Sequence, residues 1–224
     1  MEKIKDRNAL DREYETEFLR SLIPDEARPY GKLRRYSSGE LLIEQGEEPE
    51  YLFCLVRGRC CIHMYLSNGR RMILSSPEAP CLLGEMEIFD MSPTNFSVEA
   101  LEDSTVIALP LKEVRDILLE SNRFLRQLCL IIADKERSNS KKLMHAGGFP
   151  LENRLAGFIL ANSSGRVFRI KKVEIAETLG VSYRHLEKVM SDFVAAGYLR
   201  KEKLTYYIED SDALTGLADK LNVS

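Results

Sequence analysis

Residues 173–197 constrain the fold more tightly than any other segment, because they specify two short helices joined by a sharp turn. In the first helix Ile175 faces inward, and the small Ala176 lets a second helix cross closely. Gly180 can adopt the left-handed conformation that the turn needs, and Ser182 can cap the following helix. An apolar stripe of helical spacing then predicts the buried side of the second helix, formed by Leu186, Val189, Met190, Phe193 and Val194.

The outer side of this second helix is polar and carries the ring of Tyr183 and the guanidinium group of Arg184. A helix pair of this kind places its second helix in the major groove of double-stranded DNA, where outward side chains meet base edges. The sequence therefore predicts a DNA-reading face formed by Tyr183, Arg184, Glu187 and Lys188. The alternative is an ordinary antiparallel helix pair inside a core.

The charge distribution agrees with DNA as a partner, although the 224-residue chain has a net charge of −3. Residues 151–224 carry +1 and the remainder −4. Within 166–203, nine basic residues stand against five acidic ones, so positive charge brackets the helix pair where phosphates would lie. A solvated surface of mixed charge is the alternative explanation.

The pattern of apolar residues predicts an α+β protein. One helix is expected before Pro24, with an apolar face of Leu10, Tyr14, Phe18, Leu19, Leu22 and Ile23. From about Leu33 to Leu109, short apolar segments punctuated by glycines predict an antiparallel β jelly roll or sandwich. Ser67-Asn68-Gly69 is typical of a hairpin turn between two of these strands.

Helical periodicity returns after Pro110. A short helix around residues 111–118 should precede a long one from about Asn122 to His145, whose partial apolar seam suits a homodimer contact. That seam consists of Leu125, Leu128, Cys129, Ile132 and Leu143. Gly147-Gly148-Phe149-Pro150 should break the helix, which predicts a sensor domain at 1–120, a dimerisation helix at 121–146 and a DNA-binding domain at 147–224. In this last domain, residues 152–164 should form the first helix, and 198–210 a wing hairpin.

A jelly roll, a connecting helix and a C-terminal helix-turn-helix resemble the cyclic-AMP receptor protein (Crp/Fnr) family of bacterial transcription regulators. The resemblance rests on YSSGELLIEQGEEPEYLFCLVRGRCCIHM, LLGEMEIFD and IAETLGVSYRHLEKVM, and LGVSYRHL with ENRLA is most similar to YeiL-type members. It implies a cyclic-nucleotide-binding-like barrel, a winged helix-turn-helix and RNA polymerase as a partner. It also implies that Arg184 pairs with guanine, that Glu187 accepts from a cytosine amine, and that backbone phosphates lie near Lys171, Lys172 and Ser182. Tyr183 departs from the family pattern, so a different operator is expected.

The resemblance places the effector loop at Gly84 and Glu85. Members that bind cyclic nucleotides follow this pair with Arg-Ser some ten residues later, whereas this chain has no arginine between Arg71 and Arg115. A buried phosphate without a cation is costly, so cyclic AMP is not the expected effector. The effector is unknown, and the residues that would contact it are Gly84, Glu85, Thr94, Asn95, Asn139 and Ser140.

Other classes of function find little support. The three histidines lack metal-ligand spacing, no catalytic motif of the common hydrolase or nucleotide-binding types occurs, and no cofactor or metal is expected. Cysteines Cys54, Cys60, Cys61, Cys81 and Cys129 fit reduced thiols, and in an extended segment one of the adjacent Cys60 and Cys61 should be exposed. No membrane span or signal peptide is expected, which indicates a cytoplasmic protein. The competing class is a nucleotide-like sensor module that regulates a separate partner protein without binding DNA.

Overall fold

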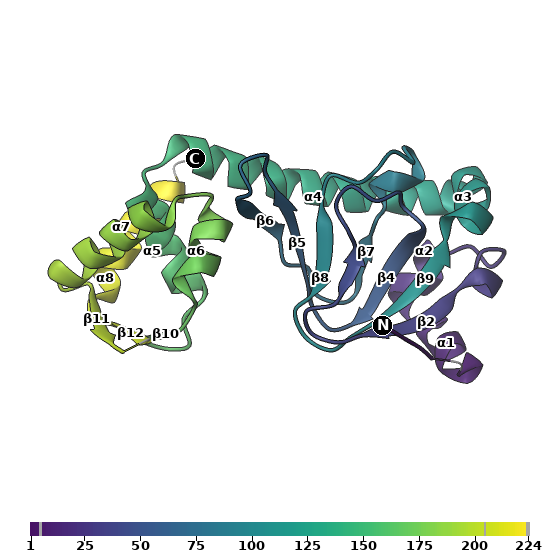
Figure 1. The fold of residues 1–224 in the computed structure, drawn as a ribbon, viewed down its shortest axis with the longest axis horizontal. Coiled ribbons are helices and arrows are strands. Elements are labelled where there is room, and N and C mark those ends of the chain that lie inside the picture. The colour runs from purple at the N-terminus through teal and green to yellow at the C-terminus, as the bar shows by residue number, and fades with distance from the viewer. Residues whose placement is uncertain (5, 204, 223–224) are drawn as a thin grey trace. The chain divides into compact units, whose positions relative to one another are not determined.

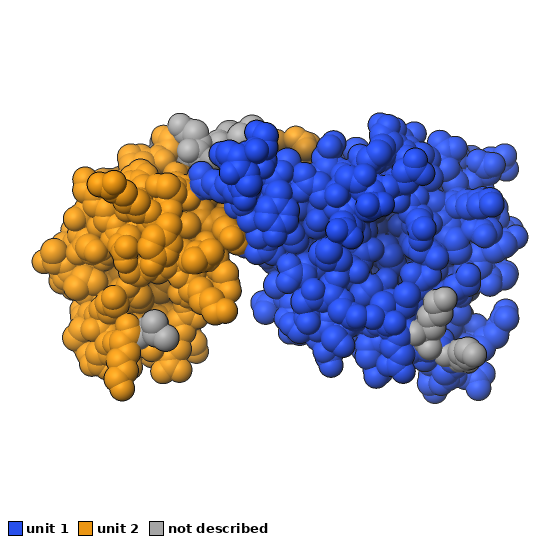
Figure 2. Space-filling view, in the orientation of Figure 1, with its two compact units in different colours: residues 1–135 blue, residues 136–224 orange. Residues whose placement is uncertain are grey.

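The chain forms two compact units, which are residues 1–135 and 136–224 (Figure 2). The structure is a computed structural model that describes residues 1–4, 6–203 and 205–222, together with their side chains except those of 3, 141–147 and 222. Among the described residues, no helix is long and apolar enough to cross a lipid bilayer.

The first unit contains two antiparallel sheets (Figure 1). The five-stranded sheet has the order β1-β2-β9-β4-β7, and the four-stranded sheet has the order β3-β8-β5-β6. Their bounds are β1 Glu2–Lys3, β2 Lys32–Tyr36, β3 Leu41–Ile43, β4 Tyr51–Arg57, β5 Cys60–Tyr65, β6 Arg71–Ser75, β7 Cys81–Leu83, β8 Ser97–Ala100 and β9 Ser104–Pro110. This arrangement confirms the predicted α+β class with an antiparallel roll, and the hairpin at Gly69 (φ 76°) joins β5 to β6.

Both faces of the five-stranded sheet are buried. Phe53 and Leu55 of β4 point into the core shared with the four-stranded sheet, whereas Leu52 and Cys54 point to the opposite face. That second face packs against helices α1 Arg7–Tyr14, α2 Glu17–Leu22, α3 Leu111–Glu120 and the first turns of α4 Asn122–Gly148. Short 3₁₀ turns at Arg28–Tyr30 and Met86–Ile88 complete this unit.

Two helix boundaries differ from the expectation. The single helix predicted before Pro24 is two helices, because Thr16 adopts an extended backbone (φ −61°, ψ 145°) and starts α2. The long helix was predicted to end near His145 but continues through both glycines to Gly148. It ends there because Pro150, two residues later, has no backbone N–H to donate within a helix. Within its predicted seam Leu128 is buried and Cys129 is exposed, and the Leu143 side chain lies outside the described residues.

The expectation that one of the adjacent Cys60 and Cys61 is exposed is wrong, because both are buried. Cys60 lies in the core between the sheets, where burial raises the pKa of its thiol to about 11. Cys61 lies on the outer face of the four-stranded sheet, beneath the polar cluster described next. Both side chains are at most 2% exposed.

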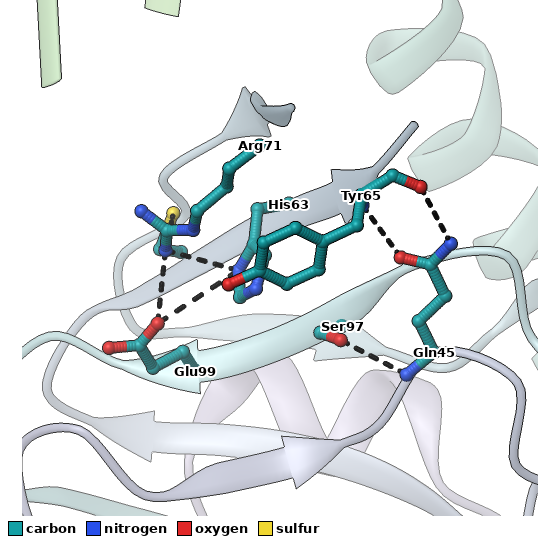
Figure 3. Close-up of polar contacts among 7 residues, drawn as sticks. Gln45, His63, Tyr65, Arg71, Ser97 and Glu99 are labelled. Carbon is teal, nitrogen blue, oxygen red and sulfur yellow. Dashed lines mark hydrogen bonds and ion pairs between the residues drawn. The ribbon is translucent and has the colours of Figure 1, made fainter. Parts of the chain in front are cut away.

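A polar cluster on this outer face was not foreseen from the sequence (Figure 3). Arg71 Nη2 lies 3.0 Å from Glu99 Oε2, 3.2 Å from His63 Nδ1 and 3.8 Å from Cys61 Sγ. The ring nitrogen Nδ1 of the buried His63 also lies 4.0 Å from Glu99 Oε2, so the three side chains form one polar group. The Gln45 amide also pairs with both backbone groups of Tyr65, which ties the end of β3 to β5.

The second unit packs helices around a three-stranded sheet of order β10-β12-β11. Its elements after α4 are α5 Leu151–Ala161, β10 Val167–Phe168, α6 Lys172–Leu179, α7 Tyr183–Ala195, β11 Leu199–Glu202, β12 Thr205–Ile208, α8 Ser211–Ala218 and a 3₁₀ turn Asp219–Asn222. The predicted hairpin at 198–210 is confirmed as β11 and β12. The core consists mainly of Leu155, Ile159, Phe168, Ile175, Leu186, Met190, Phe193 and Leu214.

Candidate nucleic-acid interface and effector loop

The turn between α6 and α7 has the predicted geometry. Gly180 ends α6 with φ 65° and ψ 29°, a left-handed conformation that a residue with a Cβ resists. The N–H of Val181 donates to the carbonyl of Ala176 (3.0 Å), which closes the turn. Ser182 Oγ accepts from the N–H of His185 (3.2 Å) and caps α7, so the direction in which α7 leaves the turn is fixed locally.

Helix α7 separates an inner from an outer face. Leu186, Val189 and Met190 are at most 1% exposed, and Phe193 is 3% exposed. Val194, which was predicted in the buried stripe, is instead 36% exposed, because the core of this unit closes over Phe193. The predicted reading face is exposed along the helix, at Tyr183, Arg184, Glu187 and Lys188.

Lys172 and Glu187 form an ion pair across the turn. Lys172 Nζ lies 2.8 Å from Glu187 Oε1 and 6.0 Å from the centre of the Tyr206 ring in β12. Hydrogen bonding to Lys172 lowers the pKa of Glu187. Burial opposes the charge on Lys172, yet its bonds to Glu187 and Tyr206 outweigh burial and raise its pKa. Lys172, which was predicted to face phosphates, is thus paired with Glu187 in this structure.

Three other cations near α7 have no acidic partner among the described residues. Lys171, Arg184 and Lys188 are exposed, and none of them forms an ion pair with a residue in the described part of the chain. Lys201 of the wing is exposed as well, with Nζ 6.0 Å from the Tyr206 ring centre. Arg200, in contrast, is paired with Glu202 and Glu209. The geometry leaves positive charge on both sides of α7 for an anionic ligand.

Two residues that position this unit were not predicted. Arg154 of α5 donates from Nη1 to the carbonyl of Leu179 (2.8 Å), which satisfies an acceptor at the end of α6. Asn153 is 5% exposed and donates to the carbonyl of Leu217 (2.9 Å) in α8. Both contacts join residues 25 or more positions apart, and the local sequence contains no signal for them.

The loop that was predicted to contact an effector forms an ion pair with α4 in the first unit. Lys135 of α4 donates from Nζ to Glu85 Oε1 (2.5 Å) and to the carbonyl of Leu82 (2.9 Å). Glu85 is 7% exposed. Gly84 (φ 78°) precedes it, and a Cβ there would lie 3.2 Å from the carbonyl oxygen of Tyr51. Lys135 was not among the predicted residues.

The remaining predicted effector residues differ in their exposure. Thr94 is 4% exposed and its hydroxyl bonds to backbone atoms of Phe96, whereas Asn95 is exposed. Asn139 and Ser140 belong to the second unit and are exposed on α4, where Ser140 Oγ lies 3.2 Å from Glu136 Oε1.

Comparison with known proteins matches both units. Residues 33–121 match the model of a cyclic nucleotide-binding domain, and residues 153–217 match that of a Crp-like helix-turn-helix domain. The regulatory protein YeiL of Escherichia coli is 38% identical over 187 residues, which cover 84% of this chain and 85% of that protein. A CRP-like cAMP-activated global transcriptional regulator of Mycobacterium tuberculosis is 22% identical, over 80% of this chain and 84% of that regulator.

Solved structures agree with the fold. A crp/fnr-family regulator from Eubacterium rectale has a TM-score of 0.76 at 17% identity and covers 93% of this chain and 97% of that one. The c-di-GMP responsive regulator CLP of Xanthomonas campestris has a TM-score of 0.72 at 15% identity, over 81% and 95% of the two chains. With its sensor-type barrel, its Crp-like helix-turn-helix and this extent of identity to YeiL, the chain belongs to the Crp/Fnr family of transcription regulators.

Proposed function

We propose that this protein regulates transcription in the bacterial cytoplasm by binding a palindromic DNA operator as a homodimer. The observation that carries the proposal is the exposed face of α7, where Arg184 and Lys188 have no acidic partner in the described part of the chain. Tyr183, Arg184 and Lys188 would meet base edges, and Lys171 and Ser182 would meet phosphates. RNA polymerase would be the downstream partner.

Dimerisation through α4 is supported by apolar exposure on that helix. Leu130 is 62% exposed and Cys129 is also exposed, in a part of α4 that belongs to the first unit. An apolar residue this exposed on a long helix suits burial against the same helix of a second copy. Two copies would place their α7 helices about 34 Å apart, one turn of B-DNA.

Cyclic AMP is not the proposed effector. The carboxylate of Glu85, which would accept from a ribose hydroxyl, is bound by Lys135. The loop also lacks the arginine that would neutralise a cyclic phosphate, and Asn95 lies in the region where that arginine is expected. Titration calorimetry with cyclic AMP should therefore give no saturable heat, and a stoichiometric binding isotherm would refute this part of the proposal.

The test of DNA binding is selection of preferred duplexes from a random pool, with the mass of the protein in solution measured by light scattering. We expect an inverted repeat whose half-sites are centred about 10 base pairs apart, and twice the chain mass. A monomer that enriches no sequence would favour a sensor module without DNA binding.

A further inference from the structure

A cavity of about 340 Å³ lies in the first unit, and its ligand would be the effector that the function proposed above leaves unnamed. It is lined by residues of β2, β3 and β4, by the loop after β3, and by Gly84 and Thr94 of the effector loop. A volume of this order is typical of pockets that hold small organic ligands.

The lining of this cavity is strongly acidic. It carries the carboxylates of Glu44, Glu47, Glu48, Glu50 and Glu87 against a single cation, Arg34. The guanidinium of Arg34 lies 4.0 Å from the centre of the Tyr51 ring, and its buried Nε has no hydrogen-bond partner in the described structure. Four of these carboxylates are exposed at the rim, and together they outnumber the one guanidinium, which favours a cation over a phosphorylated ligand.

Glu87 distinguishes this cavity from an ordinary acidic surface. The residue is 6% exposed, and its Oε2 has no hydrogen-bond partner in the described structure. Burial raises the pKa of the carboxyl group and outweighs hydrogen bonding to its own backbone and to Thr94, which lowers it. The nearby cation Lys135 is bound to Glu85 instead. A buried carboxylate oxygen without a donor costs free energy, which a ligand N–H group would recover.

The chemistry of the walls indicates which kind of cation fits. In the part of the chain that the structure describes, no three acidic, histidine or cysteine side chains converge as a metal site. The cavity is instead walled by the rings of Tyr36, Phe53 and Tyr51, with Phe53 centred 6.3 Å and 5.7 Å from the other two. Rings of this kind suit a hydrocarbon chain next to a positive group.

We propose that this cavity binds a small aliphatic diamine. One ammonium group donates to Glu87 Oε2, the hydrocarbon chain lies along the aromatic wall, and the second ammonium group meets the exposed carboxylates at the rim. The chain thus carries a binding site for an organic cation beside the loop that its family uses for cyclic nucleotides.

The experiment is titration calorimetry of the full chain with 1,4-diaminobutane at low ionic strength. We expect saturable binding of one molecule per chain, and none of butane-1,4-diol or succinate, which share the length but not the charge. Absence of saturable heat with the diamine up to millimolar concentrations, or equal binding of the diol, would overturn the proposal.

Matched variants locate the site. Glu87→Gln keeps the shape of the side chain and removes a buried charge, so the unit should remain folded while diamine affinity falls at least about tenfold. Glu78→Gln removes an exposed carboxylate that is outside the cavity and 3.8 Å from Arg59, and affinity should not change. Equal losses in both variants would mean general charge attraction and would refute the site. The measurement contains no DNA, so its outcome is independent of the operator experiment.

Discussion

Lys172 Nζ and Glu187 Oε1 lie 2.8 Å apart, so the first residue of α6 is paired with the outward face of α7. Lys172 lies at the edge of the surface where phosphates are expected, and Glu187 lies on the surface where bases are expected. Glu187 therefore competes with DNA for Lys172. A phosphate that binds Lys172 would share the ammonium group with Glu187 or displace it.

Replacing Glu187 by Gln should strengthen binding to DNA of any sequence. The change frees one cation for a phosphate, so the plot of log affinity against log salt concentration should steepen by about 0.9. Fluorescence anisotropy of a labelled random duplex at several salt concentrations measures both effects. Asp192→Asn removes an exposed charge from the same helix without releasing a lysine, so it should leave the slope unchanged. A slope for Glu187→Gln equal to that of the unmodified protein would show that the pair persists on DNA.

Arg184→Ala and Lys171→Ala should separate base recognition from backbone attraction. Arg184 is exposed on α7, and loss of a bidentate contact to a base costs about 1–3 kcal/mol at one position of the operator. Lys171→Ala should weaken all duplexes alike and make the salt slope shallower by about 1. Competition between the selected operator and a scrambled duplex measures the difference. If Arg184→Ala retained the full preference for the operator, α7 would not be the reading helix in this register.

Gly180→Ala should destabilise the second unit through its backbone conformation alone. A Cβ at this position meets nothing within 4 Å, so the cost comes from the positive φ of 65° and should be about 1 kcal/mol. Gly216→Ala is the matched control, because Gly216 lies inside α8 with equally open space and no positive φ. There alanine should stabilise by up to about 1 kcal/mol. Urea unfolding monitored by circular dichroism compares the two, and equal signs would contradict the assigned turn.

Glu87 should make the stability of the first unit depend on pH. Burial raises the pKa of this carboxyl above its ordinary value of 4.5, so the folded state holds the proton more tightly than the unfolded state. The free energy of unfolding should then fall as pH rises from about 4.5 through the raised pKa, because the folded unit must bury a charge. Glu87→Gln should remove this contribution and be the more stable form at neutral pH. Urea unfolding at several pH values tests this, and parallel profiles for the two proteins would contradict it.

The sequence alone determined the features that depend on short spacings. Local rules predict features that depend on residues close together in the sequence. These are the strand and helix pattern, the hairpin at Gly69, the left-handed turn at Gly180 and the cap at Ser182. The outer face of α7 also follows from helical periodicity. Val194 is the exception, because it belongs to the predicted apolar stripe but is 36% exposed.

Only the tertiary structure decided which charges are free. Lys172 and Glu187 are 15 residues apart, Glu85 and Lys135 are 50 apart, and Arg71 and Glu99 are 28 apart. No local pattern can predict such pairs, since each depends on how separate elements pack. The same holds for Glu87, which is buried and lines one cavity together with Arg34 and Tyr51 from earlier strands. Residue types fixed the available chemistry, and packing determined which groups remain to bind a partner.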